Sequence, residues 1–182
     1  KYTFTIPIKN ISQNALIKDI KLMITEKWKK KFLKTIEHSY SKAINFEKVF
    51  PIIEETIKPN TKFLVDLHLI SLYLIIKYLN LNTIIIQSSS KYNNRLIKGQ
   101  NRILDICFNE RANFYINLSG GMKLYDKELF IKNGIDLKFL KTEKVKYSQF
   151  KNNFVSNLSI IDILMFNDLN EICHFLNSYR LI

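Results

Sequence analysis

The sequence predicts an α/β protein with a mainly parallel sheet, because three short apolar runs alternate with two helix-compatible segments between residues 83 and 140. The runs are Thr83–Gln87, Asn113–Asn117 and Ile135–Phe139, and each is rich in the β-branched or aromatic residues that strands favour. Crossovers of this length return the chain to the same sheet in a right-handed sense, so the strands run parallel. Since parallel strands are covered on both faces, we expect a Rossmann-like three-layer arrangement with helices on both faces.

The two segments between these strands have the features of helices. In the first, apolar side chains from Leu96 to Phe108 recur with a helical period, although Gly99 weakens the middle of the segment. In the second, Asp126 can cap a short helix and Gly134 can end it.

Small and polar residues follow each predicted strand. The carboxyl ends of parallel strands share one edge of a sheet, where backbone N–H groups can approach a phosphate or carboxylate. The alternative is that Gly120 and Gly121 only supply the positive φ of a tight turn. No phosphate-loop or dinucleotide-binding pattern is present, so the sequence indicates a site without naming its ligand. The residues at this edge are Ser88, Ser89, Ser90, Ser119, Gly120, Gly121, Lys141 and Thr142.

The amino-terminal part is expected to contain two strands and three helices. Tyr2–Ile8 and Leu16–Ile24 are the predicted strands, possible partners in a hairpin, with Pro7 confining the first to an edge or a strand end. Trp28 lies on the apolar face of the first helix, so we interpret it as a core residue rather than a binding aromatic. The first predicted helix begins at Thr25, the second spans Phe46–Ile57 and the third spans Phe63–Leu79.

The carboxyl end is expected to be rich in helices. One helix covers Leu158–Asn167, and Ser159 followed by Asp162 has the spacing of a capping box. Asp162 therefore either holds the start of this helix or takes part in chemistry. The final helix is expected over Asp168–Arg180, with its inward face formed by Ile172, Cys173, Leu176 and Tyr179.

Length and charge limit the classes of function. With 182 residues and 47% hydrophobic residues, the chain is expected to form one domain over residues 1–182. The net charge of +12 comes almost entirely from scattered lysines, and the arginines are Arg95, Arg102, Arg111 and Arg180. Readers of nucleic acid favour arginine and exposed aromatics, so we expect anionic small molecules rather than nucleic acid as partners.

Cysteine usage and hydropathy favour a cytoplasmic protein without a metal site. Cys107 and Cys173 form no CxxC pair, which is typical of a reducing compartment. Asp66, His68 and Lys77 interrupt the most apolar helix, so no membrane span is expected. The chain begins in a strand without an initiator methionine, as expected for the carboxyl-terminal part of a longer protein.

Several motifs in a fixed order give the chain a resemblance to a known family. They are WKKKFLKTIEHSYSKAINF from Trp28, the Ser88–Ser90 loop, RILDIC from Arg102, YINLSGGMKLY from Tyr115, Phe130 with Gly134 and Ile135, and Tyr147 with Gln149 before LSIIDILMFN. Together they resemble the WbqC-like family over nearly the whole chain. The resemblance implies a cytoplasmic bacterial protein of O-antigen or capsule synthesis that transfers an acyl or aminoacyl group to a nucleotide-linked amino sugar. The opening segment of that family, H-Q-P-x-Y-x-P-W-x-G, has no counterpart here.

The resemblance assigns provisional roles to the candidate residues. The loops at Ser88–Ser90 and Ser119–Gly121 would hold phosphates, with charge from Arg102 and Lys141. Asp162 is the candidate general base, since an attacking amine must lose a proton. No cofactor is evident, and the donor would be an acyl-coenzyme A or an activated amino acid. The alternative is a non-catalytic scaffold of polysaccharide assembly. The other predicted substrate-binding residues are Asn117, Tyr125, Gln149 and Ser159.

Overall fold

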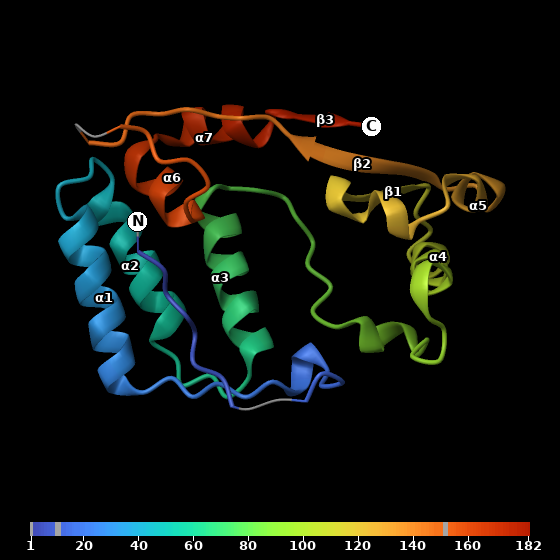
Figure 1. Ribbon diagram of the computed structural model, residues 1–182, viewed down its shortest axis with the longest axis horizontal. Coiled ribbons are helices and arrows are strands. Elements are labelled where there is room, and N and C mark those ends of the chain that lie inside the picture. The colour runs from blue at the N-terminus through green and yellow to red at the C-terminus, as the bar shows by residue number, and fades with distance from the viewer. Residues whose placement is uncertain (1, 10–11, 151–152) are drawn as a thin grey trace. The chain divides into compact units, whose positions relative to one another are not determined.

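The computed structural model describes residues 2–9, 12–150 and 153–182, and the chain divides into two compact units (Figure 1). Unit 1 comprises Lys1–Ile84 and Lys146–His174, and unit 2 comprises Ile85–Val145 and Phe175–Ile182. Each unit has a hydrophobic core of its own. Among the described residues, no helix combines the length and the apolar character that crossing a membrane requires.

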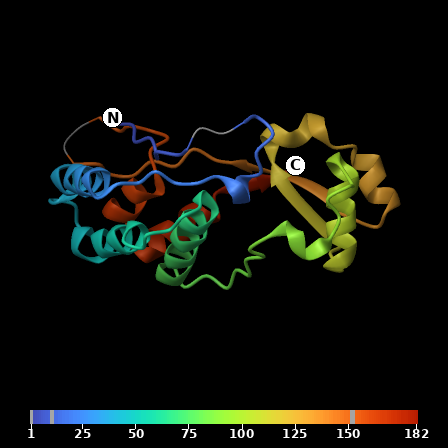
Figure 2. The same ribbon diagram turned by 90° about the horizontal axis from the view of Figure 1, so that it is seen from below.

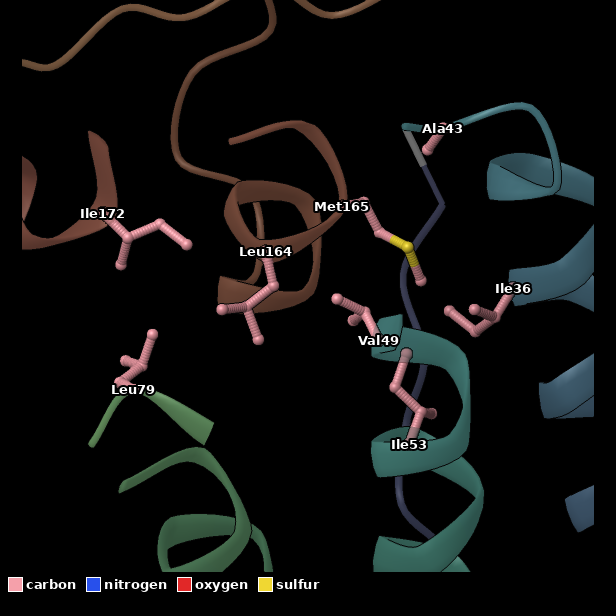
Figure 3. Close-up of a cluster of buried hydrophobic side chains, with 8 residues drawn as sticks. All are labelled: Ile36, Ala43, Val49, Ile53, Leu79, Leu164, Met165 and Ile172. Carbon is pink, nitrogen blue, oxygen red and sulfur yellow. The ribbon is translucent and has the colours of Figure 1, made fainter. Parts of the chain in front are cut away.

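Unit 1 is helical. Helix α1 (Glu26–Tyr40) is capped by Thr25, and α2 (Phe46–Ile57) and α3 (Leu64–Tyr78) follow as the apolar periodicity predicts. Near the carboxyl end, α6 (Ile160–Phe166) and α7 (Leu169–Leu176) complete the unit 1 core. Figure 3 shows the eight buried side chains of this core, which are Ile36, Ala43, Val49, Ile53, Leu79, Leu164, Met165 and Ile172.

The two strands predicted at the amino terminus do not form. The chain makes isolated antiparallel bridges instead, between Ile8 and Leu22 and between Lys21 and Phe63, with a 3-10 turn η1 at Ile17–Asp19. The predicted pairing of the first segment with the second is therefore reduced to one bridge. Pro7 offers a carbonyl to Met23 but has no N–H for a ladder, which limits any longer pairing.

Unit 2 is built on a small mixed sheet. Strands β1 (Phe114–Leu118) and β2 (Asp136–Thr142) run parallel, with Phe114 opposite Asp136 and Leu118 opposite Leu140. This confirms the parallel pairing predicted for these two runs. Helices α4 (Gly99–Asn109) and α5 (Lys127–Lys132) contribute buried side chains to one core with Leu137 and Phe139 of β2. The ribbons of these helices and strands can be followed in Figures 1 and 2.

The prediction of a Rossmann-like three-layer fold is wrong in three respects. Thr83–Gln87 forms no strand, and the third strand is β3 (Tyr179–Leu181), which pairs antiparallel with β2. The helices of unit 2 pack on the face that carries Leu137 and Phe139, whereas Phe114, Ile116 and Leu118 project from the opposite face and are exposed. The fold is therefore α/β with one small mixed sheet.

The carboxyl-terminal helix is shorter than predicted. It ends at Leu176, and the chain then turns to satisfy the open edge of β2, where Phe139 and Ile182 exchange two backbone hydrogen bonds of 2.8 and 3.0 Å. Of the side chains expected to face inward, Ile172 is buried, whereas Cys173, Leu176 and Tyr179 are exposed. Pairing with a distant strand has overridden the local helical pattern.

Candidate functional site

Asp162 lies in unit 1 at the third position of α6 and is almost completely buried, with 3% of its surface exposed. Its Oδ1 accepts a hydrogen bond from the Tyr40 hydroxyl at 2.8 Å. Its Oδ2 accepts from the Tyr147 hydroxyl at 2.6 Å and from Gln149 Nε2 at 2.6 Å. Both carboxylate oxygens are thus engaged by neutral donors, and this cluster is called the Asp162 network below.

The capping box predicted for α6 is only half present. Ser159 does cap the helix, because its Oγ accepts from the Ile161 N–H at 3.3 Å. The Asp162 carboxylate does not return to the cap but accepts from the Asp162 network instead. Gln149 also bonds to both backbone groups of Val155, at 2.7 and 3.1 Å, and so holds the irregular segment before α6.

The two phenols of the Asp162 network, Tyr40 and Tyr147, should make the free energy of unfolding depend on pH in the alkaline range. Burial, and then the hydrogen bond to Asp162, raise the pKa of Tyr40 and of Tyr147 above the ordinary phenol value. Because the folded pKa is the higher one, this stabilisation is complete below the unfolded pKa of about 10 and is lost as pH rises further.

We therefore expect the free energy of unfolding, measured by urea titration, to fall as the pH rises above about 10. Tyr147→Phe should make this fall shallower, because one of the two phenols is removed. Tyr2→Phe changes an exposed phenol and is the control that should leave the slope unchanged. An identical slope in the wild type and in Tyr147→Phe would contradict the assignment.

A second polar cluster lies at the carboxyl end of β1 in unit 2. Asn117 Nδ2 donates to the Tyr115 hydroxyl at 3.2 Å, and the hydroxyls of Tyr115 and Tyr125 lie 3.2 Å apart. Gly121 sits in the 3-10 turn η3 (Ser119–Leu124) that follows the strand. A Cβ at Gly121 would lie 3.2 Å from Asn117 Nδ2, whereas a Cβ at Gly120 would meet nothing within 4 Å.

This geometry excludes the tight-turn interpretation of the glycine pair, and the phosphate-binding interpretation stays a prediction. Among the described glycines, positive φ occurs at Gly99 and Gly134, so neither Gly120 nor Gly121 serves a left-handed turn. Gly121 instead permits close approach of the turn to the Asn117 amide. The sequence-predicted residues Asn117, Gly121 and Tyr125 are therefore brought together, and Tyr115 joins them.

Counting protons shows that the tyrosine pair retains a donor. Whichever hydroxyl donates across the 3.2 Å contact, the other phenolic proton has no acceptor among the described residues. Burial, and then the contact with Tyr125, raise the pKa of Tyr115, so this hydroxyl stays protonated at neutral pH. The cluster can donate one hydrogen bond to an oxygen atom of a bound molecule.

A third cluster, also in unit 2, surrounds Arg102. Its Nε donates to Asn94 Oδ1 at 3.0 Å, and its Nη2 donates to Ser89 Oγ at 3.1 Å. Ser88 caps the short turn η2 (Ser89–Tyr92), with its Oγ accepting from the Ser90 N–H. The loop Ser88–Ser90, called the serine loop below, is thus hydrogen-bonded to Arg102. It does not lie at the carboxyl end of a strand as predicted, because residues 83–87 form no strand.

The structure divides the predicted site residues between the two units. Asp162, Gln149 and Ser159 belong to unit 1, whereas the serine loop, Arg102 and the cluster at the end of β1 belong to unit 2. Sequence reasoning missed Asn94, Tyr115 and the partner role of Tyr40. Of these three residues, only Tyr115 could have been identified from the sequence. It lies two positions before Asn117 in a predicted strand, and residues at that spacing project to the same face.

A hollow of about 700 Å³ in unit 1 contains none of the predicted residues. Lys29 lines it, and its Nζ lies within 3.3 Å of Glu26 Oε1, the Lys58 carbonyl and Asn60 Oδ1. Each of the three ammonium protons of Lys29 therefore has an oxygen acceptor, and two of these acceptors link residues 58–60 to α1. In the described part of the chain, no group of His, Cys, Asp and Glu side chains is arranged to hold a metal ion.

The fold and these contacts define an α/β protein with a cluster of polar side chains at the carboxyl end of a parallel strand. Residues 1–174 match the sequence model of the WbqC-like protein family. The chain therefore belongs to the WbqC-like protein family, which confirms the resemblance of its motifs. No curated protein and no solved structure matches the chain.

Proposed function

We propose that this protein acts in the cytoplasm in bacterial surface-polysaccharide synthesis, where it transfers an acyl or aminoacyl group to a nucleotide-linked amino sugar. Membership of the WbqC-like family supports the general setting. The observation that carries the chemical part is the phenolic proton of the Tyr115–Tyr125 pair that has no acceptor among the described residues.

Acyl transfer to an amine needs the kind of donor that this pair provides. The amine nitrogen attacks the carbonyl carbon of an acyl-coenzyme A or an activated amino acid, and the carbonyl oxygen becomes negatively charged. A fixed hydroxyl that donates to this oxygen stabilises the charge as it develops. The amine then loses a proton to a base, the C–N bond remains, and the thiolate or phosphate of the donor departs.

The candidate base is a separate part of the proposal, because Asp162 belongs to unit 1 and the tyrosine pair belongs to unit 2. Asp162 is the candidate from the sequence, but both of its oxygens already accept hydrogen bonds from the Asp162 network. Oδ1 accepts one hydrogen bond and Oδ2 accepts two, so one lone pair of Oδ1 remains to take a proton from an amine.

The two adjacent glycines of η3 offer a matched test of the site. Gly121→Val should weaken binding about tenfold or more, because its Cβ would lie only 3.2 Å from Asn117 Nδ2 and would displace that amide from the Tyr115 hydroxyl. Gly120→Val adds the same side chain where a Cβ meets nothing within 4 Å, and it should bind as the wild type does. Thermal-shift titration with nucleotide-activated amino sugars and acyl-coenzyme A species measures both variants, because ligands that bind only the folded state raise Tm.

A wild-type protein whose Tm responds to none of these ligands would contradict the proposed function. Equal affinities in the two glycine variants would contradict the placement of the site at the end of β1.

The second candidate is a non-catalytic module that scaffolds polysaccharide assembly. It is favoured by the Asp162 network, because a buried carboxylate with three hydrogen bonds is typical of a structural anchor. Mass spectrometry of an amino-sugar nucleotide incubated with donor and protein separates the two candidates. Acylated sugar supports the transferase, and tight binding without product supports the scaffold.

A further inference from the structure

The guanidinium of Arg102 is held on one edge only. The Nε–H and the neighbouring Nη2–H form one side of the planar fork, and Asn94 Oδ1 and Ser89 Oγ accept from these two atoms. The opposite edge consists of the Nη1 protons and the second Nη2 proton. No residue in the described ranges accepts from this edge, and Arg102 forms no ion pair with any described carboxylate.

A chain of hydrogen bonds fixes the direction in which this free edge points. Asp105 Oδ2 accepts from Asn94 Nδ2 at 2.7 Å, which sets the orientation of the Asn94 amide and turns its Oδ1 towards Arg102. Asn94 is only 6% exposed, so its amide has little freedom to turn over. Asp105 and Asn94 are therefore positioning residues for a cation whose own partners are neutral.

The surroundings of Arg102 favour an anion with more than one negative charge. Arg95 and Lys98 lie exposed in the connection just before α4, and neither has an ion-pair partner among the described residues. Lys91 differs, since it is already paired with Glu110. A free guanidinium edge binds the oxygens of phosphate or carboxylate in a bidentate manner, and the added charges favour phosphate.

We propose that the free edge of Arg102 binds a phosphate-class oxoanion, such as the diphosphate of a nucleotide-linked substrate. The identity of the natural ligand rests on the proposed function, but the site itself does not. Inorganic pyrophosphate carries neither sugar nor acyl group, so it probes the guanidinium edge alone.

Calorimetric titration of the full chain with pyrophosphate tests the site. Arg102→Gln should weaken binding about tenfold or more, since a bidentate charge-assisted contact is lost. Arg111→Gln removes the same charge from an exposed position of unit 2 that follows α4 and lies outside this cluster, and it should change the affinity by less than about twofold. Equal losses in the two variants would show a diffuse attraction and overturn the proposal, as would acetate binding as tightly as pyrophosphate.

Nuclear magnetic resonance of the wild type decides the matter if Arg102→Gln does not fold. The chain has arginine at positions 95, 102, 111 and 180, so the Nε–H signals can be assigned individually. Pyrophosphate should shift the Arg102 signal most, and an unmoved Arg102 signal would overturn the proposal. Pyrophosphate bound at Arg102 with no binding of any nucleotide sugar would remove the proposed function and leave the site standing. If sugar nucleotides bind Arg102→Gln as tightly as they bind the wild type, Arg102 does not hold their diphosphate. The proposed function would then stand and the role of Arg102 would be overturned.

Discussion

Asp162→Asn is expected to lower the free energy of unfolding by about 3 kcal/mol, because hydrogen bonds to a charged acceptor contribute more than neutral ones. The substitution replaces one acceptor oxygen by an NH₂ group. In the place of Oδ1 this group faces the Tyr40 hydroxyl, and in the place of Oδ2 it faces the Tyr147 hydroxyl and Gln149 Nε2. At 3% exposure, no water is at hand to relieve the opposed donors. Urea unfolding followed by circular dichroism measures the loss.

Asp66→Asn is the matched control. Asp66 occupies the third position of α3 just as Asp162 occupies the third position of α6, so both carboxylates interact with a helix amino terminus. Asp66→Asn should cost no more than about 1 kcal/mol, which is the usual range of that interaction. Equal losses in the two variants would show that the Asp162 network adds nothing beyond the helix dipole.

The same pair of variants bears on catalysis. If Asp162→Asn loses stability but binds sugar nucleotides and forms product at wild-type rates, the carboxylate is structural. If product formation stops while binding and folding persist, Asp162 is the base. The rate of product formation separates the two outcomes, because a purely structural role of Asp162 would leave that rate unchanged in the folded protein.

Helices were predictable here because their signals are local. The bounds of α2 agree with the prediction at both ends, and the cap at Asp126 lies where the sequence placed it. The helix predicted to begin at Thr25 begins at Glu26, with Thr25 as its cap. The predicted helix over residues 96–108 begins instead at Gly99, so that glycine lies at its first position rather than in its middle. Apolar periodicity and capping chemistry are properties of neighbouring residues, so they survive without knowledge of the fold.

Strand pairing was predictable only in part, because it depends on distant partners. Strands β1 and β2 are separated by one short helix, and their parallel register follows from the crossover. By contrast, Tyr179–Leu181 pairs with β2 across almost forty residues, and nothing in its local sequence indicates this. The run at residues 83–87 has the composition of a strand and yet forms none, which shows how far β propensity depends on context.

The candidate site shows the same division between local and distant information. Asn117 and Tyr125 were identified from one continuous motif, and the structure places them together with Gly121. The contact of Asp162 with Tyr40 joins residues 122 positions apart, so spacing along the chain could suggest only the capping role. The orientation of Arg102 by Asn94 required the fold of the loop before α4.

Phe130→Ala is expected to lower the stability of unit 2 by about 4 kcal/mol, which is typical of a large aromatic side chain removed from a core. Phe130 is fully buried and packs against the rings of Tyr115 and Tyr125. The two cores share no residue, so the loss should fall on unit 2 first. Hydrogen exchange of amides in β1 and β2 measures unit 2, and the fluorescence of Trp28, the single tryptophan, measures unit 1.

Val49→Ala is the reciprocal variant, because Val49 is fully buried in the unit 1 core. It should shift the Trp28 transition and leave exchange in β1 and β2 nearly unchanged. A single domain over residues 1–182, as the length of the chain predicts, requires instead that both probes move together in both variants. If both probes do move together, the two units unfold in one equilibrium. A loss of binding in any variant must then be corrected for the fraction of unfolded protein before it is assigned to a site.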